Sequence, residues 1–475
     1  MVSIGIVGGG PGGLMTAWFL GRRFGANADI SIYEASPRLG GKVITQRFGK
    51  ALVPYEAGVA EIYGYSAVGP DPLRDLIECE LGLSTTPMDG DAVVLDRRMH
   101  IGVSGIERHY GPATARAIRR FRALCASMLT PQEYYDGDID SDNKHRWARI
   151  TEAELLTREI DDRTARKYFE VMARSDIAAD PHQTNGLNAL KNFLMDVDGY
   201  IDTYSIDGGM ERLVSTLAGR VPGQIHLNHR VGRVGIAPSG RYRVTMTHDS
   251  RILEREFDLI FLCLPHNWLS TVSFDDEKLA QAMTAHIAHF DRPAHYLRLA
   301  MLFDRPFWGD AIPGSWFMSE AFGGCCVYDE GKRHDTLGYG VLNWLIPGSA
   351  VLAWGNLELQ PILDAAFDTL PPPLREQARA HLIEARVHRF LASVNAVPGG
   401  MIARSVDVNH MPGGAEYPGL YAVGDYLFDS TLNGLLDSAD YATDFALDYA
   451  TALNEAASRT ESIAAPLAMA AARRA

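Results

Sequence analysis

The clearest hydrophobic pattern lies at the start of the chain. The apolar run "SIGIV" (residues 3–7) is typical of a buried strand, and "LMTAWFLGRRFG" (residues 14–25) has apolar positions at helical spacing. Five glycines in "GGGPGG" (residues 8–13) separate them, and the apolar run "DISIYEA" (residues 29–35) follows. The pattern therefore predicts a strand, a glycine turn, a helix and a second strand.

Similar patterns recur along the chain. Residues 105–200 contain helical patterns such as "ATARAIRRFRALCASML" and "NALKNFLMDV", whereas "HYLRLAMLFDRPFW" (residues 295–308) alternates as a strand and then turns. Three consecutive strands are predicted from "QIHLNHRVGRVG", "YRVTMTHD" and "FDLIFLCLP", which begin at residues 224, 242 and 257. The polar stretch "YYDGDIDSDNKHR" (residues 134–146) predicts a surface loop. The order of elements indicates an α/β protein.

Composition narrows the class of protein. With 475 residues, 47% of them hydrophobic, the chain can bury a core divided between two or three domains. A net charge of −14 argues against nucleic acid or an anionic membrane as a partner. Five scattered cysteines without metal-type spacing, and no leader or membrane-length apolar run, predict a cytoplasmic protein. His286 and His289 stand at helical spacing without a third ligand, so no metal site is expected.

The glycine turn fits the binding of a dinucleotide. Gly8, Gly10 and Gly13 match GxGxxG, in which the first glycine permits a tight turn, the second lets backbone approach a pyrophosphate, and the third lets helix pack on strand. The helix N-terminus then faces the phosphates with its partial positive charge. Glu34 ends the second strand about 20 residues beyond the last glycine, where an acid binds a ribose hydroxyl.

A second glycine loop, "ASPRLGGK", follows this acid directly. At this point the sequence resembles the flavin-containing amine oxidase family, which includes monoamine, polyamine and L-amino acid oxidases and, more distantly, phytoene desaturases and protoporphyrinogen oxidases. The family carries an acid followed by R-x-G-G, whose arginine and glycines lie along the FAD pyrophosphate and the flavin edge. The matching residues here are Arg38, Gly40 and Gly41.

Further motifs of the family occur in its order. "YEAGVAEI" resembles the turn beside the flavin, "SIDGGMERLVSTLA" resembles a helix start, and "GLYAVGDYLFDSTLNGLLDSAD" resembles the C-terminal motif. The resemblance implies that the last helix points its N-terminus at the flavin C2 carbonyl, where it would stabilise the reduced flavin. The cofactor-binding residues implied by the resemblance are Glu56, Gly58, Val231 against adenine, Gly424, Asp425, Gly434 and Asn433, which replaces the usual acid of the family.

The resemblance also implies an architecture. It is an α/β fold with a Rossmann-like FAD-binding domain of the GR2 amine-oxidase type, interleaved with a mixed-sheet substrate domain and a helical cap. We expect the FAD domain at residues 1–70, 200–275 and 415–455, the substrate domain at 71–104 and 276–414, the cap at 105–199 and a tail at 456–475.

Several positions depart from the family. Arg298 stands where the family has a lysine that holds a water against flavin N5, so Arg298 is either an active-site residue or a buried ion-pair partner. Many members place a tryptophan where this chain has "SVN" (residues 393–395). Tyr426 is either an aromatic residue near the flavin or a core residue. No cysteine lies near the C-terminal motif, so we expect FAD to be bound non-covalently.

The expected activity is oxidation of a C–N bond of an amine or amino acid. The resemblance implies hydride transfer to flavin N5, release of an imine and reoxidation of the flavin by dioxygen with formation of hydrogen peroxide. The expected partners are thus a small amine or amino-acid-like substrate and dioxygen. Whether the chain also forms a homodimer stays an open question. Two alternatives remain, which are a C–C desaturase or isomerase of the phytoene desaturase type and a non-redox flavin enzyme.

Overall fold

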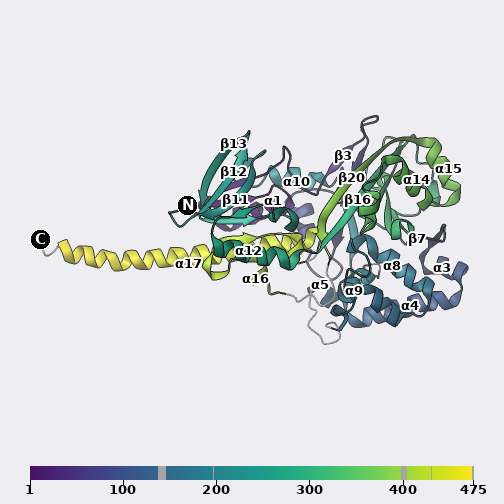
Figure 1. The fold of residues 1–475 in the computed structure, drawn as a ribbon, viewed down its shortest axis with the longest axis horizontal. Coiled ribbons are helices and arrows are strands. Elements are labelled where there is room, and N and C mark those ends of the chain that lie inside the picture. Colours follow the sequence, from purple (N-terminus) through teal and green to yellow (C-terminus); the bar gives the residue numbers. More distant parts are fainter. Residues whose placement is uncertain (137–145, 196, 397–403, 429, 473–475) are drawn as a thin grey trace.

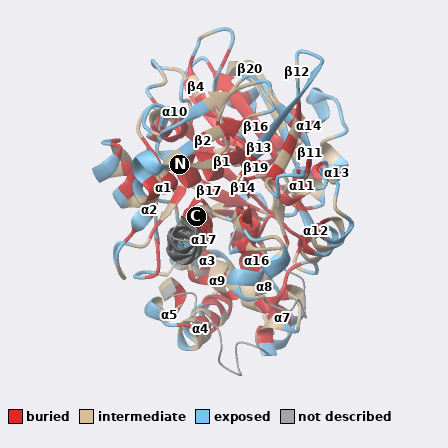
Figure 2. Cartoon of the chain, turned by 90° about the vertical axis from the view of Figure 1, so that its left-hand side faces the viewer, coloured by how far each residue is buried: buried red, intermediate tan, exposed pale blue. Residues whose placement is uncertain are grey.

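The computed structural model describes residues 1–136, 146–195, 197–396, 404–428 and 430–472, with side chains up to residue 452. Residues 137–145 of the loop predicted at 134–146 thus lie outside the described residues, whereas residues 134–136 are the end of a helix. Buried residues concentrate on the strands in the interior, and the outer helices expose one side to solvent (Figure 2).

A five-stranded parallel sheet gathers strands from distant parts of the chain (Figure 1). The predicted strand, turn, helix and second strand are β1 (Val2–Val7), α1 (Pro11–Phe24) and β2 (Ala28–Tyr33). Alternation along β1 sends Ile4 and Ile6 towards Leu14 of α1 on one face and Val7 to the other face. The spatial order is β10 (Gln224–His226), β2, β1, β14 (Leu259–Leu262) and β21 (Leu420–Ala422).

A four-stranded sheet covers the other face of this parallel sheet. Val234 and Val244 from this sheet share a buried cluster with Val7 and Tyr33. Helix α12 (Glu277–Phe290) contributes Leu279 to the same cluster. The strand order is β13 (Arg251–Phe257), β12 (Tyr242–His248), β11 (Arg230–Ile236) and β15 (Ser273–Phe274).

A seven-stranded mixed sheet forms the second large layer. Its long strand β16 (Pro293–Phe303) lies between β20 (Leu382–Asn395) and β19 (Gly340–Pro347), antiparallel to both. One face packs on α13 (Ala350–Trp354), α14 (Leu359–Thr369) and α15 (Pro372–His381). The order continues through β18 (Cys325–Asp329), β17 (Trp316–Ser319), β7 (Ala92–Leu95) and β8 (Arg98–Ile101).

The opposite face of this sheet meets the helices predicted between residues 105 and 200. Cys326, Tyr328 and Leu345 from the sheet lie in one buried cluster with Phe169 and Ile177 of the helices. In Figure 1 these helices gather at one end of the molecule. They are α3 (Gly102–Tyr110), α4 (Pro112–Met128), α5 (Pro131–Asp136), α7 (Glu152–Glu159), α8 (Arg163–Ile177) and α9 (Gly186–Leu194).

Two small sheets and several short helices connect these layers. β3 (Thr45–Arg47) pairs with β4 (Pro54–Glu56), and β9 (Asp202–Ile206) lies between β5 (Ile62–Gly64) and β6 (Thr85–Met88). The connecting helices are α2 (Pro72–Arg74), α10 (Glu211–Ala218), α11 (His266–Leu269) and α16 (Val406–His410).

The last helix, α17 (Leu432–Ala472), starts beside α1 and then extends away from the rest of the molecule (Figure 1). Residues 456–472, expected to form a tail, continue this helix.

Candidate functional site

The first glycine loop joins β1 to α1 in a conformation that side chains would obstruct. Gly8 has φ +110°, and a Cβ there would lie 2.4 Å from the carbonyl oxygen of Cys263. A Cβ on Gly13 would lie 2.0 Å from the carbonyl oxygen of Gly8. Around Gly10, in contrast, nothing comes nearer to such a Cβ than 3.9 Å. Gly8 and Gly13 thus allow tight packing, while Gly10 leaves the backbone open to a ligand at the start of α1.

The second glycine loop lies against the first. The Gly40 N–H donates to the Gly9 carbonyl over 2.9 Å, and a Cβ on Gly41 would lie 3.5 Å from the Gly10 Cα. The Arg38 guanidinium donates to the carbonyl oxygens of Leu39 and Gly41 at 2.8 and 2.7 Å. The guanidinium therefore stabilises its own loop.

Glu34 binds both loops together at the end of β2. Its Oε2 accepts the N–H of Gly9, and its Oε1 accepts the N–H of Ser36, each at 2.8 Å. Val231 packs nearby, in the cluster that holds Val7 and Tyr33. The structure thus brings the predicted glycines, acid and valine to the carboxyl ends of parallel strands, where α/β sheets bind nucleotides.

The C-terminal motif reaches the same place from the other end of the chain. Asp425 forms an ion pair with Lys42 Nζ at 2.5 Å, directly after the second glycine loop. The Gly424 N–H donates to Ser438 Oγ over 3.0 Å. A Cβ on Gly12 would lie 3.0 Å from Leu435, so the starts of α1 and α17 adjoin.

Two predicted residues near the start of α17 have protein contacts of their own. Asn433 Nδ2 donates to the Tyr63 carbonyl over 3.1 Å, while its buried Oδ1 has no partner among the described residues. The Gly434 N–H donates to Thr431 Oγ1 at 3.0 Å and is thereby part of the helix cap. Ser393, where the family tryptophan is absent, accepts a hydrogen bond from Lys42 Nζ at its carbonyl over 2.7 Å.

Glu56 and Gly58 support the loops from behind. The buried Glu56 carboxylate accepts the Met210 N–H and the Thr45 hydroxyl, both at 3.0 Å, and lies 3.2 Å from His334 Nε2. A Cβ on Gly58 would lie 1.9 Å from the Lys42 carbonyl oxygen. The structure therefore gives the Glu56 side chain protein partners, and Gly58 allows the chain to pass Lys42.

The two predicted catalytic residues lie in different surroundings. Arg298 is on β16, only 3% exposed, and its Nε and Nη1 have no hydrogen-bond partner among the described residues. Tyr426 packs in a buried cluster with Phe290, and its hydroxyl lies 3.2 Å from His286 Nε2. Burial raises the pKa of the Tyr426 hydroxyl and lowers that of His286 to about 3. Tyr426 therefore has the contacts of a core residue.

A polar cluster surrounds Arg298. Glu61 lies within the motif "YEAGVAEI" and Tyr63 directly follows it, but the motif gave no reason to place either residue beside Arg298. The Tyr328 hydroxyl donates to Glu61 Oε1, and the Tyr63 hydroxyl donates to Asp176 Oδ1, both at 3.2 Å. Burial raises the pKa of Glu61, against the opposing influence of Arg333 and Arg298. Tyr296 could have been found by strand alternation from Arg298, but Asp176 and Tyr328 carry no local signal.

This cluster rests on a buried ion pair. Arg333 donates to both oxygens of Glu330 at 2.7 Å. Burial alone would raise the pKa of Glu330, but the Arg333 guanidinium lowers it to about 2. Arg333 and Glu330 thus satisfy each other's hydrogen-bonding groups. Of the two buried arginines Arg298 and Arg333, Arg298 is therefore the one whose Nε and Nη1 have no partner among the described residues.

The residues present fit a flavin dinucleotide. The open backbone at Gly10 and Gly41, the start of α1 with no acidic residue in its first turn, and the buried unpartnered Asn433 Oδ1 lie on the converging segments. These features provide backbone donors for phosphates at one end and polar groups at the other. The polar cluster around Arg298 is joined to this region through Tyr63, whose carbonyl accepts the Asn433 hydrogen bond.

The chain belongs to the family of flavin containing amine oxidoreductases, whose model matches residues 11–342. The protein is therefore a flavin-dependent oxidoreductase, as the family resemblance implied. A comparison with curated proteins gave no match.

Several solved structures share the fold of this chain. Cyclohexylamine oxidase from Brevibacterium oxydans IH-35A has a TM-score of 0.68 at 18% identity, over 94% of this chain and 99% of that one. Putrescine oxidase bound to putrescine has a TM-score of 0.67 at 18% identity, over 93% and 98%. A protein assigned as a protoporphyrinogen oxidase from Exiguobacterium sp. 255-15 has a TM-score of 0.69 at 18% identity, over 95% and 99%. These likenesses confirm the predicted fold.

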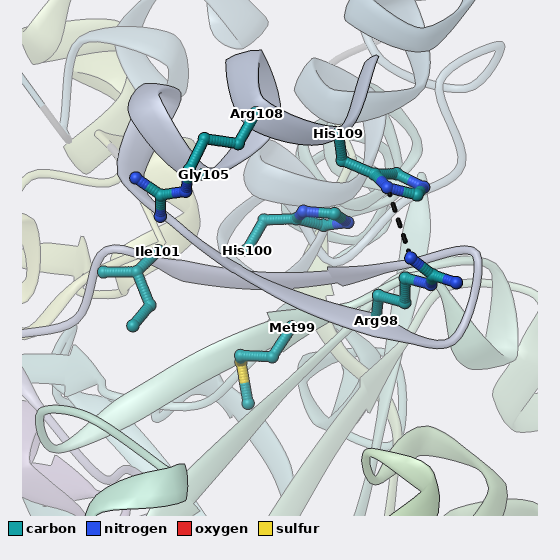
Figure 3. A pocket seen from close by; sticks show the side chains of 7 residues that line it. All are labelled: Arg98, Met99, His100, Ile101, Gly105, Arg108 and His109. Atoms are coloured by element: carbon teal, nitrogen blue, oxygen red, sulfur yellow. Dashed lines mark hydrogen bonds between the residues drawn. The ribbon is translucent and has the colours of Figure 1, made fainter.

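Other features of the surface stand apart from this site. A pocket of about 300 Å³ lies between strand β8 and helix α3 and is lined by Arg98, His100, Arg108 and His109. His109 Nδ1 lies 3.4 Å from Arg98 Nη1 (Figure 3). It contains none of the predicted site residues. Within the described ranges, no three potential metal ligands cluster, and no helix has the length and apolarity needed to cross a bilayer.

Proposed function

We propose that the flavin is FAD, bound without a covalent link across the converging segments. The glycine loops support this, because they offer backbone N–H groups where a pyrophosphate would lie. Cys263 is the cysteine whose backbone contacts the first glycine loop. Its thiol is buried 3.6 Å from Thr16 Oγ1, so it has a protein partner instead of a covalent link to the cofactor. The residues that would hold FAD are Gly8, Gly10, Gly13, Glu34, Arg38, Gly40, Gly41, Val231, Gly424, Asp425, Asn433 and Gly434, with Glu56 and Gly58 in supporting positions.

The same segments support the proposed division of the chain. Strands β1, β2, β10, β14 and β21 come from residues 1–70, 200–275 and 415–455, which we assign to FAD binding. The seven-stranded sheet comes from 71–104 and 276–414, assigned to the substrate, and the helices of 105–199 cover it.

The protein is further proposed to oxidise a C–N bond of an amine or amino acid. The observation that carries this proposal is the polar cluster of the buried Arg298 with the half-buried Glu61 and Tyr63 next to the start of α17. Such a cluster can orient a small polar substrate and exclude bulk water. FAD, when bound, supplies a hydride acceptor at N5 and passes the electrons to dioxygen, giving hydrogen peroxide.

The residues around the substrate then have two tasks. The amine has to be neutral before its C–H bond can be oxidised, and the Glu61 carboxylate, whose pKa burial raises, can accept the ammonium proton. Tyr63 and Tyr296, both half-buried, lie in this region and can hold the carbon skeleton. The substrate leaves as an imine, which water hydrolyses.

Anaerobic mixing tests this proposal. Purified flavin-loaded protein is mixed with separate amines and amino acids, and the absorbance band of the oxidised flavin is followed. Bleaching by members of either class is the expected result, with hydrogen peroxide formed in equimolar amount when air is admitted. If no amine or amino acid bleaches the flavin, C–N oxidation is excluded, and C–C desaturation or non-redox flavin chemistry becomes the better assignment.

A further inference from the structure

Arg298 is a buried cation with free hydrogen-bond donors. It lies on β16, the strand between β20 and β19, and is 3% exposed. Its Nε and Nη1 are buried and have no hydrogen-bond partner among the described residues. A buried guanidinium with unsatisfied donors is costly, so the arrangement requires a compensating group.

The neighbouring groups do not satisfy these donors. The guanidinium carbon lies 5.0 Å from the centre of the Tyr328 ring, so the ring supports it by a cation–π contact. His388 stands directly opposite on β20, and burial and Arg298 both lower its pKa, so it is a neutral neighbour. Glu61 interacts with Arg298 electrostatically, but its one hydrogen bond among the described residues is accepted from the Tyr328 hydroxyl, and the Arg333 guanidinium is bound to Glu330.

The remaining titratable groups around Arg298 are also engaged or remote. Asp176 accepts the Tyr63 hydroxyl. Tyr296, on the same face of β16 two residues earlier, donates to the Ser175 carbonyl. Cys326 is a neutral thiol, because burial raises its pKa well above the ordinary value. Protein groups therefore surround the guanidinium without occupying the two free nitrogens.

We propose that Arg298 binds the carboxylate of the substrate, and hence that the substrate is an amino acid rather than a simple amine. This inference rests on the proposed C–N oxidation. A guanidinium donates charge-assisted hydrogen bonds to a carboxylate, and the N–H groups on Nε and Nη1 of Arg298 are free to form them. Tyr63, which is half-buried, lies on the side of the cluster joined to the start of α17.

Matched pairs of substrates test the role of Arg298. Each amino acid is compared with the amine that lacks its carboxylate, using phenylalanine with 2-phenylethylamine, tryptophan with tryptamine and lysine with cadaverine. Anaerobic flavin reduction gives the rate and apparent Kd for each compound. In the wild type, one of the amino acids is expected to reduce the flavin, and the matching amine is expected to do so at least about 100-fold less efficiently. This is the size of effect that an unpaired buried charge produces.

Variants separate binding from structure. Arg298→Met is expected to lower the efficiency with the amino acid about 100-fold and to change that with the amine less than about threefold. Arg298→Lys, which keeps a charge, is expected to recover part of the loss. Arg386→Met, an exposed arginine on β20, is the matched control and should behave as wild type. Equal losses with both substrates in Arg298→Met, or a wild type that prefers the amines, would overturn the assignment.

Benzoate binding distinguishes failure of this inference from failure of the proposed function. Benzoate cannot be oxidised here, and its binding is followed through the flavin spectrum and by calorimetry. Binding in the wild type that weakens at least about tenfold in Arg298→Met supports the carboxylate site even if no substrate bleaches the flavin. If benzoate did not bind, or bound equally well to Arg298→Met, the carboxylate site would be contradicted. The proposed oxidation of a C–N bond would be unaffected by that result.

Discussion

At the residue scale, Glu34 has a second role beside the one its position predicts. Its two oxygens accept N–H groups from Gly9 and Ser36, so it holds the first glycine loop in place. The loop conformation and any contact with a ribose therefore depend on the same carboxylate. An uncharged, shorter side chain would remove both effects.

Replacing this side chain tests the cofactor assignment. Glu34→Ala is expected to weaken FAD binding by about 10- to 100-fold, because about two hydrogen bonds to a charged group are lost. The measurement is the flavin content of the purified protein and the Kd from fluorescence titration of the flavin-free form. Glu107→Ala, which removes a surface partner of Arg119, serves as the control. Unchanged flavin content and affinity in Glu34→Ala would contradict the assignment.

At the element scale, the position of α1 depends on a close contact between backbones. A Cβ on Gly13 would lie 2.0 Å from the Gly8 carbonyl oxygen, an atom of rigid backbone. The helix can therefore start directly above β1 only if residue 13 has no side chain. Since α1 also adjoins the start of α17, a displaced α1 would disturb both halves of the candidate site.

Gly13→Ala is accordingly expected to lower the free energy of unfolding by about 3 kcal/mol and to reduce flavin content. Chemical denaturation followed by circular dichroism measures the first, and the ratio of flavin to protein absorbance measures the second. Gly219→Ala is the matched control, since it sits at the end of α10 with φ −75° and its Cβ would meet nothing nearer than 3.6 Å. A stable, flavin-rich Gly13→Ala protein would show that the close contact is unimportant.

At the scale of the whole molecule, the candidate cofactor site is assembled from parts that lie far apart in sequence. The loops at residues 8–13 and 38–41 meet the start of α17 beyond residue 430, and Lys42 is bonded to Asp425. A ligand that contacts all three segments links the two ends of the chain. Its binding should thus stabilise the folded protein as a whole.

Removal of the flavin is expected to lower the Tm. Adding FAD back at about 100 times its Kd should restore about 2.7 kcal/mol of stability, since the ligand binds the folded state. Differential scanning calorimetry of the flavin-free and reconstituted protein measures the change. Riboflavin, which lacks the pyrophosphate and adenosine, should restore less. A Tm that saturating FAD leaves unchanged would argue against a ligand that joins these segments.

The sequence by itself determined the local elements and the cofactor loops. Glycine spacing, apolar runs and an acid at the end of a strand act through neighbouring residues, so the β1–α1–β2 unit and the family resemblance could be predicted from the order of residues alone. The helices of residues 102–194 and strand β16 followed from the same periodicity.

Only the tertiary structure decided which polar groups are free. Glu56 carries a family motif, yet its carboxylate is bonded to Met210 and Thr45, and Tyr426 packs with His286 and Phe290. Within the part of the chain that the structure describes, two nitrogens of Arg298 have no hydrogen-bond partner. Hydrogen-bond partners and burial arise where strands and helices distant in sequence pack together, so no local pattern specifies them.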